Sequence, residues 1–299
     1  MDSHIHFTVD GKPVSPEELP HMIDEYKRHG IFFLKDMGHK TGIGLKAREL
    51  TGSGVIVQSA GYALYKKGGY GSFLGKGSLG KDEIRRSIQE IADAGADFIK
   101  VINSGIVSTK GSGMITEGCF SPEDLKIIHE EALKRNLELA CHANSDTAIR
   151  NAVEAGVSSI EHGFFISRET LHMMAESGTA WTPTAFALRT LASIVEPSEK
   201  RYIEKVVENH LSSLQYAASI GVRLRAGTDS GSKGVRHVAS FIEELRLWEK
   251  AGLSLEQILS AACMHEEEIE KGNYMLVRRD FLSTGKIEAV YRGCVRVNP

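Results

Sequence analysis

Residues 137–183 read LELACHANSDTAIRNAVEAGVSSIEHGFFISRETLHMMAESGTAWTP, and this stretch decides the fold. Three short apolar runs in it are typical of buried strands, and two helical patterns separate them. We expect strands at 137–143, 158–162 and 179–183, and helices at 146–155 and 169–177. Strands that alternate with helices of this length form parallel βαβ units. The stretch therefore predicts an α/β fold with a parallel sheet.

The same alternation extends along most of the chain. Further strands are expected at 4–6, 30–34, 55–59, 97–102 and 222–228, and further helices at 16–29, 44–50, 81–94, 122–135, 197–220 and 237–251. Ser121 before Pro122 is typical of a helix N-cap. A long glycine-rich segment, 61–80, is either a binding loop or an ordinary surface excursion. Eight strands alternating with helices predict a (β/α)8 TIM-like barrel.

Composition favours one large domain that binds a small molecule. The 299 residues, 41% hydrophobic and 25% charged, suffice for a single barrel with a full core. Because the net charge is −3 and no long basic run occurs, we expect neither nucleic acid nor a membrane surface as a partner. Four cysteines without CxxC spacing are typical of reduced thiols, and no apolar run approaches the ~18 residues of a spanning helix. We expect a cytoplasmic protein.

Six candidate metal ligands lie at the C-terminal ends of expected strands. Residues i and i+2 of a strand point to the same side, so the imidazoles of His4 and His6 can reach one cation. The complete set is His4, His6, Lys100, His142, His162 and Asp229. Catalytic groups of a (β/α)8 barrel collect at the carboxyl ends of its strands, where all six are expected.

Each candidate alone has an ordinary structural interpretation. A lone HxH near a chain end is weak evidence, and a buried lysine such as Lys100 is often paired with a carboxylate. A single strand histidine is more often satisfied by the backbone, and Asp229 could cap the next helix. The coincidence of six on strands one, four, five, six and eight is harder to reach by accident. The pattern therefore predicts a hydrolase with two metal ions.

These residues resemble the amidohydrolase superfamily in its binuclear form. The motifs are GADFIKV (95–101), FSPEDLKIIHEEA (120–132), CHAN (141–144), AIRNAVEAGVSSIEHG (148–163), WTPT (181–184), AGTDSG (226–231) and LSLEQIL (253–259). They are similar to the imidazolonepropionase-related group that includes metal-dependent prolidases and other Xaa-amino-acid dipeptidases. The resemblance covers most of the chain, from Asp2 to about Ala262.

The resemblance implies a ligand set and a mechanism. His4, His6 and Asp229 would hold the buried metal, and His142 and His162 the more exposed one. Lys100 would be carboxylated on its amine and bridge the two divalent cations, which we expect to be zinc. A metal-bridging hydroxide would attack the scissile carbonyl, and Asp229 would pass its proton to the leaving nitrogen. The implied activity is hydrolysis of a C–N bond in an amide or dipeptide-like substrate.

Three further residues are candidate substrate contacts. Tyr70 lies in the glycine-rich segment, and His237 is expected near the mouth of the barrel. Asn144 stands where many dipeptidase-like members carry a tyrosine, and an amide can also donate a hydrogen bond to an oxyanion. This departure from the family pattern leaves two alternatives open. One is a lactone or ester hydrolase, and the other is a catalytically impaired relative that binds a ligand or partner without turnover.

The two ends of the sequence depart from the resembled pattern. Relatives usually carry strands before the HxH motif that join C-terminal strands in a small β-sandwich, whereas only three residues precede His4 here. We expect a barrel domain at 1–265 and a residual C-terminal β segment at 266–299, with the N-terminal part of the sandwich absent. Open strand edges would then remain. Either a second copy of the chain covers them, in the homo-oligomer that we expect, or this chain starts later than its natural ancestor did.

Overall fold

Two parallel sheets form the centre of the molecule. The computed structural model describes residues 1–50, 52, 54–108, 115, 119–263 and 270–297. The three-stranded sheet has the order β1 (Asp2–Ile5), β4 (Phe33–Asp36), β5 (Ile56–Ser59). The six-stranded sheet has the order β11 (Ala180–Thr182), β10 (Ser159–Phe165), β9 (Glu138–Ser145), β8 (Phe98–Ile102), β6 (Ala63–Lys66), β7 (Gly75–Ser78). The predicted α/β class with a parallel sheet is therefore confirmed.

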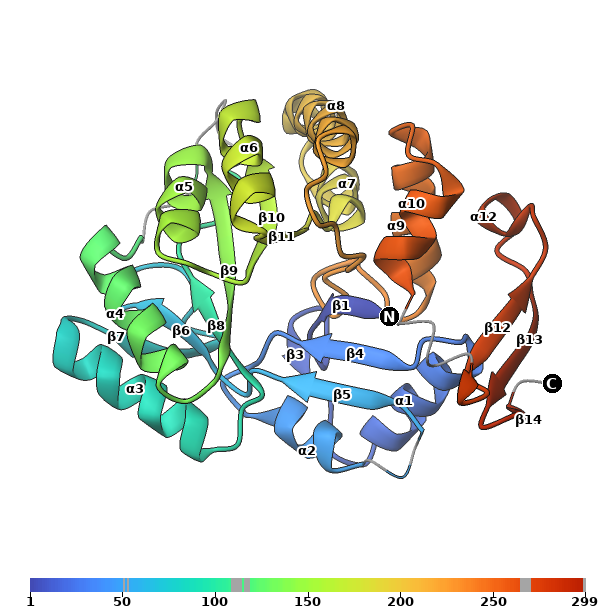
Figure 1. The fold of residues 1–299 in the computed structure, drawn as a ribbon, viewed down its shortest axis with the longest axis horizontal. Coiled ribbons are helices and arrows are strands. Elements are labelled where there is room, and N and C mark those ends of the chain that lie inside the picture. The colour runs from blue at the N-terminus through green and yellow to red at the C-terminus, as the bar shows by residue number, and fades with distance from the viewer. Residues whose placement is uncertain (51, 53, 109–114, 116–118, 264–269, 298–299) are drawn as a thin grey trace.

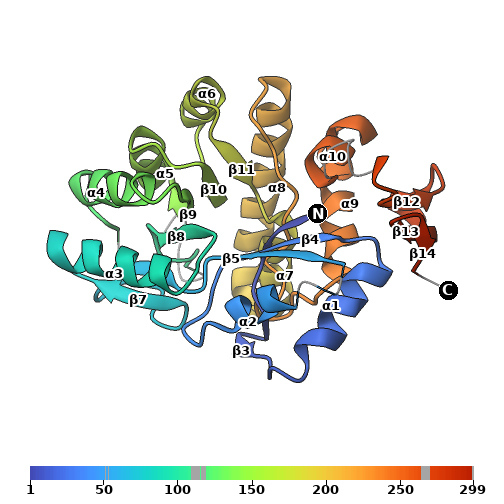
Figure 2. The same ribbon diagram turned by 60° about the horizontal axis from the view of Figure 1, so that its bottom comes forward.

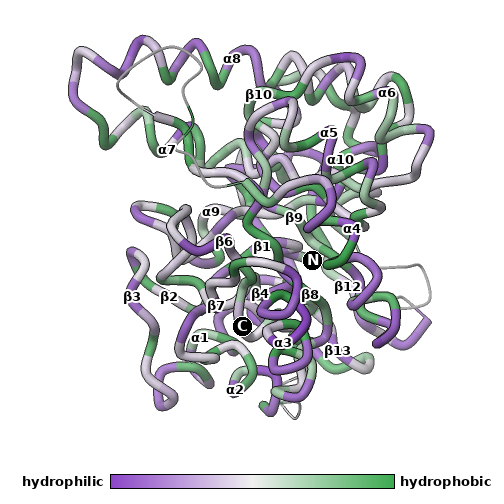
Figure 3. The backbone as a smooth tube through the Cα atoms, turned by 90° about the vertical axis from the view of Figure 1, so that its left-hand side faces the viewer, coloured by the Kyte–Doolittle hydropathy of each residue, from purple (hydrophilic) through white to green (hydrophobic). Residues whose placement is uncertain are grey.

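Amphipathic helices lie around the outside of these strands (Figure 1). They are α1 (Leu19–Arg28), α2 (Ile43–Glu49), α3 (Lys81–Asp93), α4 (Pro122–Leu133), α5 (Asp146–Glu154), α6 (Arg168–Ser177), α8 (Pro197–Ser219), α9 (Ala239–Lys250) and α10 (Leu255–Ala262). Along α8 hydrophilic and hydrophobic positions alternate in Figure 3, and Ile203, Val206 and Leu214 are its buried face. Burial of such faces against the sheet supplies most of the helical stability.

Local capping explains where several helices begin. Ser121 accepts a hydrogen bond from the backbone N–H of Asp124 at 3.1 Å, and the Asp124 carboxylate accepts one from Ser121 N–H at 3.3 Å. This reciprocal pair is a capping box, and Pro122 occupies the first helical position. Ser145 and Ser167 cap α5 and α6 in the same way with their hydroxyls. The predicted N-cap at Ser121 is confirmed.

The prediction of a strand at 222–228 is wrong, because these residues form no regular strand. The segment forms a single parallel bridge from Leu224 to Trp181, and another follows just beyond it, from Ser230 to Ile5. Arg223 O accepts from Trp181 N–H at 2.8 Å on one side, and Ala226 O accepts from Ser3 N–H at 2.8 Å on the other. Its backbone bonds are thus divided between β11 and β1, which leaves no continuous ladder with either neighbour.

The glycine-rich segment 61–80 also differs from the expected loop, because it contains the strands β6 and β7. Ala63 pairs in parallel with Gly75 on one side and with Lys100 on the other. A Cβ at Gly75 would lie 1.9 Å from the carbonyl oxygen of Ala63, so the close approach of the two backbones requires glycine there. Composition alone indicated a loop, whereas these glycines allow tight strand packing.

Helix α7 (Ala185–Ile194) was not predicted, and its N-terminus is capped from a distant helix. Its N-cap residue Thr184 is left-handed, with φ of 48°, and makes no side-chain cap of its own. The buried carboxylate of Glu244 on α9 instead accepts the backbone N–H groups of Ala185 and Phe186 at 3.0 and 2.6 Å. It also accepts Trp248 Nε1–H at 2.8 Å. Glu244 therefore fixes where α7 begins.

The C-terminal residues form a small antiparallel sheet beside α9. Its order is β12 (Tyr274–Val277), β13 (Ile287–Arg292), β14 (Val295–Arg296), and the short helix α12 (Phe281–Thr284) lies between the first two strands in the sequence. Figures 1 and 2 both show this sheet to one side of the central strands. Arg246 of α9 donates to the carbonyl oxygen of Leu282, which ties α12 to the larger part. The predicted boundary between 265 and 266 lies outside the described residues.

A short antiparallel pair, β2 (Thr8–Val9) and β3 (Lys12–Pro13), follows β1 directly. Within the part of the chain that the structure describes, every helix is too short or too polar to cross a bilayer.

Replacing Glu244 with alanine should lower the free energy of unfolding by about 3 kcal/mol, because three buried N–H donors then lose their acceptor. Urea denaturation followed by circular dichroism measures this change. Glu243→Ala is the matched control on the same helix, since Glu243 is 40% exposed and its ion pair with Arg246 is worth at most about 1 kcal/mol. Equal losses from the two variants would contradict the capping role of Glu244.

Candidate metal centre

Three side chains converge at the carboxyl end of β1 and after the segment 222–228. Nε2 of His4 and Nε2 of His6 each lie 3.5 Å from the same carboxylate oxygen, Oδ1 of Asp229. The potential ligand atoms of all three residues lie within 4.8 Å of one another. Two imidazole nitrogens and a carboxylate oxygen are a donor set that suits zinc and similar divalent cations. The structure thus brings together the three residues expected at the buried metal.

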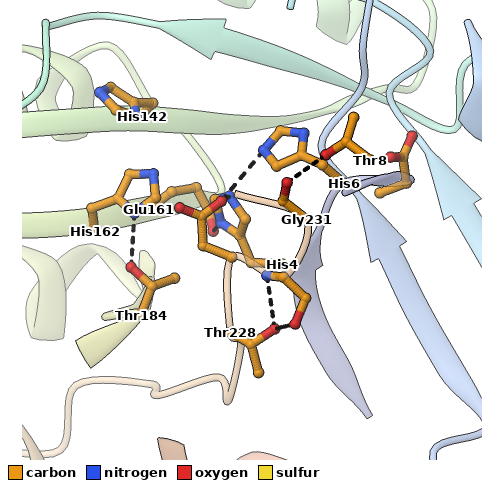
Figure 4. Close-up of polar contacts among 12 residues, drawn as sticks. His4, His6, Thr8, His142, Glu161, His162, Thr184, Thr228 and Gly231 are labelled. Atoms are coloured by element: carbon orange, nitrogen blue, oxygen red, sulfur yellow. Dashed lines mark hydrogen bonds and ion pairs between the residues drawn. The ribbon is translucent and has the colours of Figure 1, made fainter. Parts of the chain in front are cut away.

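The other three candidates border this cluster. The ring centroid of His162 lies 4.8 Å from that of His4 and 4.6 Å from that of His142. Figure 4 shows His142 and His162 on one side of the group and His4 and His6 on the other. Lys100 lies on β8 with its side chain buried, and it lines the same cavity. All six candidates therefore occupy one site.

One ring nitrogen of each histidine is held by a neighbouring acceptor or hydroxyl. Nδ1–H of His4 donates to the Glu161 carboxylate at 2.7 Å, and Nδ1–H of His6 donates to Gly38 O at 2.9 Å. Nε2–H of His142 donates to Gly105 O at 3.1 Å. Nδ1 of His162 lies 2.7 Å from the Thr184 hydroxyl. The bonds of His4, His6 and His142 leave the second nitrogen of each ring with its lone pair, which is the tautomer that a metal ligand needs.

Burial keeps these imidazoles neutral. It lowers the pKa of His6 to about 4 and that of His142 to about 3, while the pKa values of His4 and His162 fall well below their usual range. Burial also lowers the pKa of Lys100 and raises that of Asp229 to about 7. Desolvation thus disfavours every charge in the group, and a neutral imidazole is the form that binds a cation.

Two buried polar atoms in the site lack a hydrogen-bond partner among the described residues, namely Nε2 of His4 and Nζ of Lys100. A buried polar atom without a partner costs free energy, so such atoms call for a ligand. Nε2 of His4 lies 3.5 Å from Oδ1 of Asp229, so His4, His6 and Asp229 would hold one cation together. The residues present therefore fit a divalent metal.

Left-handed backbone places two of the ligands. His162 has φ of 70° and Asp229 has φ of 58°, a conformation that is uncommon for residues other than glycine. Adjacent strand residues normally point to opposite faces, but the turn at His162 lets both Glu161 and His162 reach the site. Such outliers cluster at functional sites.

Sequence reasoning missed the residues that orient the ligands. Glu161 is fully buried between His4 and the hydroxyl of Ser159, which donates to it at 2.6 Å. Thr184 holds His162, and Asp2 accepts from the Thr228 hydroxyl at 2.8 Å beside the HxH motif. The one available signal was an acidic residue in the apolar run SSIEHG, where a carboxylate needs a buried partner.

A cavity of about 320 Å³ opens above the candidate ligands. Tyr70 and Asn144, two of the predicted substrate contacts, line it. The Tyr70 ring lies 5.7 Å from that of His142, and the Asn144 amide donates to Gly105 O at 3.1 Å.

His237, the third predicted contact, does not line this cavity. Its Nδ1 lies 2.7 Å from the hydroxyl of Tyr26, and its Nε2–H donates to Thr8 O at 2.7 Å. Both ring nitrogens are therefore occupied within the protein. Contact between His237 and a substrate stays a prediction.

Known proteins are similar to this chain in sequence and in fold. Ochratoxinase of Aspergillus niger is 32% identical over 214 residues, which are 69% of this chain and 42% of that protein. This chain thus spans less than half of the length of that relative. The crystal structure of A. niger ochratoxinase superimposes with a TM-score of 0.80 at 21% identity, over 99% of this chain and 82% of that one. A Xaa-Pro dipeptidase with bound methionine gives 0.81 at 19% identity, over 100% and 86%.

At sequence identities near 20%, these two structural similarities show a common fold but not a common function. The family relationship comes from the sequence pattern, which matches the amidohydrolase family over residues 1–268. That span includes all six candidate ligands and both parallel sheets. The chain belongs to the amidohydrolase family.

Proposed function

We propose that this protein is a metal-dependent hydrolase of carbon–nitrogen bonds that acts on an amide or dipeptide-like substrate. One observation carries the proposal: four neutral histidines, Lys100 and Asp229 converge on the floor of a single cavity. Membership of a family that typically binds divalent metals supports it. Ochratoxinase and the dipeptidase, both hydrolases by name, are its relatives in sequence and in fold.

In this proposal the site holds two cations, which we take to be zinc. His4, His6 and Asp229 would bind one, and His142 and His162 the other. Lys100, carboxylated on Nζ, would bridge them, which is supported by the lack of a partner for that atom among the described residues. When bound, the cations would supply Lewis acidity toward water and toward a substrate carbonyl.

The protein side chains would then position the reactants and move the proton. The Asp229 carboxylate, within reach of both His4 and His6, would accept a proton from the attacking water and deliver it to the leaving nitrogen. Tyr70 and Asn144, which line the cavity beside His142, would donate hydrogen bonds to the carbonyl oxygen as charge develops. The apolar walls of the cavity would exclude bulk water.

We also propose that the two sheets close into a (β/α)8 barrel at 1–265, with 266–299 as an added β segment. The backbone hydrogen bonds of 223–230 to β11 on one side and to β1 on the other support this. On the opposite side, Ser59 at the end of β5 accepts from Asp97 N–H at 2.9 Å, just before β8. Association of two copies would cover the exposed side chains of Leu276 and Val295 on the small sheet.

Metal content tests the proposal first. Protein incubated with zinc and bicarbonate should retain close to two equivalents by elemental analysis, because two sets of neutral ligands are present. Lys100→Ala should retain one or fewer, whereas Lys76→Ala, a surface lysine paired with Glu90, should retain both. A wild-type protein that holds no metal would favour the ligand-binding alternative over hydrolysis.

Asp229→Asn should reduce amide hydrolysis by roughly 10²–10⁴-fold, because the amide cannot accept the proton. Turnover of a dipeptide panel by the metal-loaded variant measures the loss, and far-UV circular dichroism verifies the fold. Asp93→Asn, on the exposed face of α3, is the matched control and should keep full activity. Retained turnover in Asp229→Asn would remove this residue from the proton pathway.

Glu161→Gln should weaken zinc binding by about 10- to 100-fold, since His4 loses the carboxylate that orients its ring and raises its basicity. Competition with a chromophoric chelator measures the affinity without any need for turnover. Glu154→Gln, an exposed position on α5, serves as the control. Unchanged zinc affinity in Glu161→Gln would show that the His4 ring is oriented by other contacts.

A further inference from the structure

One apolar wall of the cavity above the candidate ligands comes from a single helix, α7. Ala187, Leu188, Leu191 and Ile194 of α7 all line it. Their spacing of one, four and seven residues from the first places them on one face of the helix. Neither the ligands nor the proposed proton transfer uses this face.

Large apolar side chains around the cavity are exposed to solvent, which is costly without an occupant. Phe73 is 39% exposed, Ile106 is 45% exposed and Ile194 is 43% exposed. They come from three separate parts of the chain: the connection between β6 and β7, the segment after β8, and α7. Scattered exposed apolar residues are normal, but three that converge on one cavity mark a binding surface.

The helix that carries the wall is held in place by contacts with α8 and α9. Leu188 and Ala192 pack with Ile203 and Val206 of α8 in one buried cluster. Glu244 of α9 caps the first turn through Ala185 and Phe186. The wall is also coupled to the ligands, because Thr184, directly before α7, bonds to His162. A preformed surface of this kind loses little freedom when it binds.

We propose, building on the function proposed above, that the substrate is an amide with a bulky apolar group, aromatic or branched, which sits against the face of α7. Burial of such a group is favourable in proportion to the apolar area removed from water. A small or charged group in the same place would leave the wall hydrated. The wall would thus select substrates by size and polarity, while the metal ligands act on the amide itself.

Four amides test this selection: N-acetylglycine, N-benzoylglycine, N-acetylphenylalanine and N-benzoylphenylalanine. At least one apolar member should exceed N-acetylglycine in kcat/KM by 10-fold or more with the zinc-loaded protein. Leu191→Asn and Ile194→Asn should each reduce that ratio severalfold, and both positions tolerate polarity because neither is fully buried. Leu133→Asn is the control, since Leu133 is 64% exposed on α4 and lies outside the cavity lining.

Binding to the Asp229→Asn protein separates this inference from the proposed activity. Isothermal titration calorimetry should show that the best apolar amide binds at least 10-fold more tightly than N-acetylglycine. A second substitution in the same protein, Leu191→Asn or Ile194→Asn, should reduce this preference. The same binding preference without any hydrolysis by the wild type would sustain the apolar site and overturn the hydrolase. The apolar site would be overturned if the two amides bound with nearly equal affinity, or if neither α7 substitution changed the ratio of their affinities.

Discussion

The buried hydrogen bond between the His4 imidazole and the Glu161 carboxylate, 2.7 Å long, joins β1 of one sheet to β10 of the other. It fixes the tautomer of His4 and leaves the lone pair on Nε2, which lies 3.5 Å from Oδ1 of Asp229. Neither partner is accessible to water, so the loss of one would leave the other buried and unsatisfied. The relative placement of the two sheets and the geometry of the candidate metal site therefore depend on the same contact.

The regular alternation of β10 is interrupted at His162, so that His162 reaches the site beside Glu161. With φ of 70° the backbone turns, and Trp181 secures the turn by donating Nε1–H to the carbonyl oxygen of His162 at 2.9 Å. The next residue is glycine, and a Cβ on Gly163 would lie 2.8 Å from that same indole nitrogen. The indole, the glycine and the left-handed histidine are thus one packed unit. The strain at His162 is maintained by its surroundings.

Sequence periodicity predicted the parts of the structure that depend on local pattern. The apolar runs around Lys100, His142 and His162 indicated parallel strands, and the ends of those strands indicated where the ligands meet. Periodicity could not predict α7, because its N-terminus is capped by Glu244, 59 residues away. Nor could it predict that Glu161 and His162, although adjacent, both reach the site, since that requires left-handed backbone at His162. Long-range contacts, rather than propensity, determine these features.

Two features of the cavity oppose folding and have a common explanation. On its floor, Lys100 Nζ and His4 Nε2 are buried without a hydrogen-bond partner among the described residues, which destabilises the folded state. At its mouth, Phe73, Ile106 and Ile194 keep large apolar surfaces in water. Ligands that bind only the folded state stabilise it by mass action. A cation would give the polar atoms on the floor a partner, and an apolar group would cover the exposed side chains of the wall. The two features together fit a substrate with a polar end directed toward the metal and an apolar end.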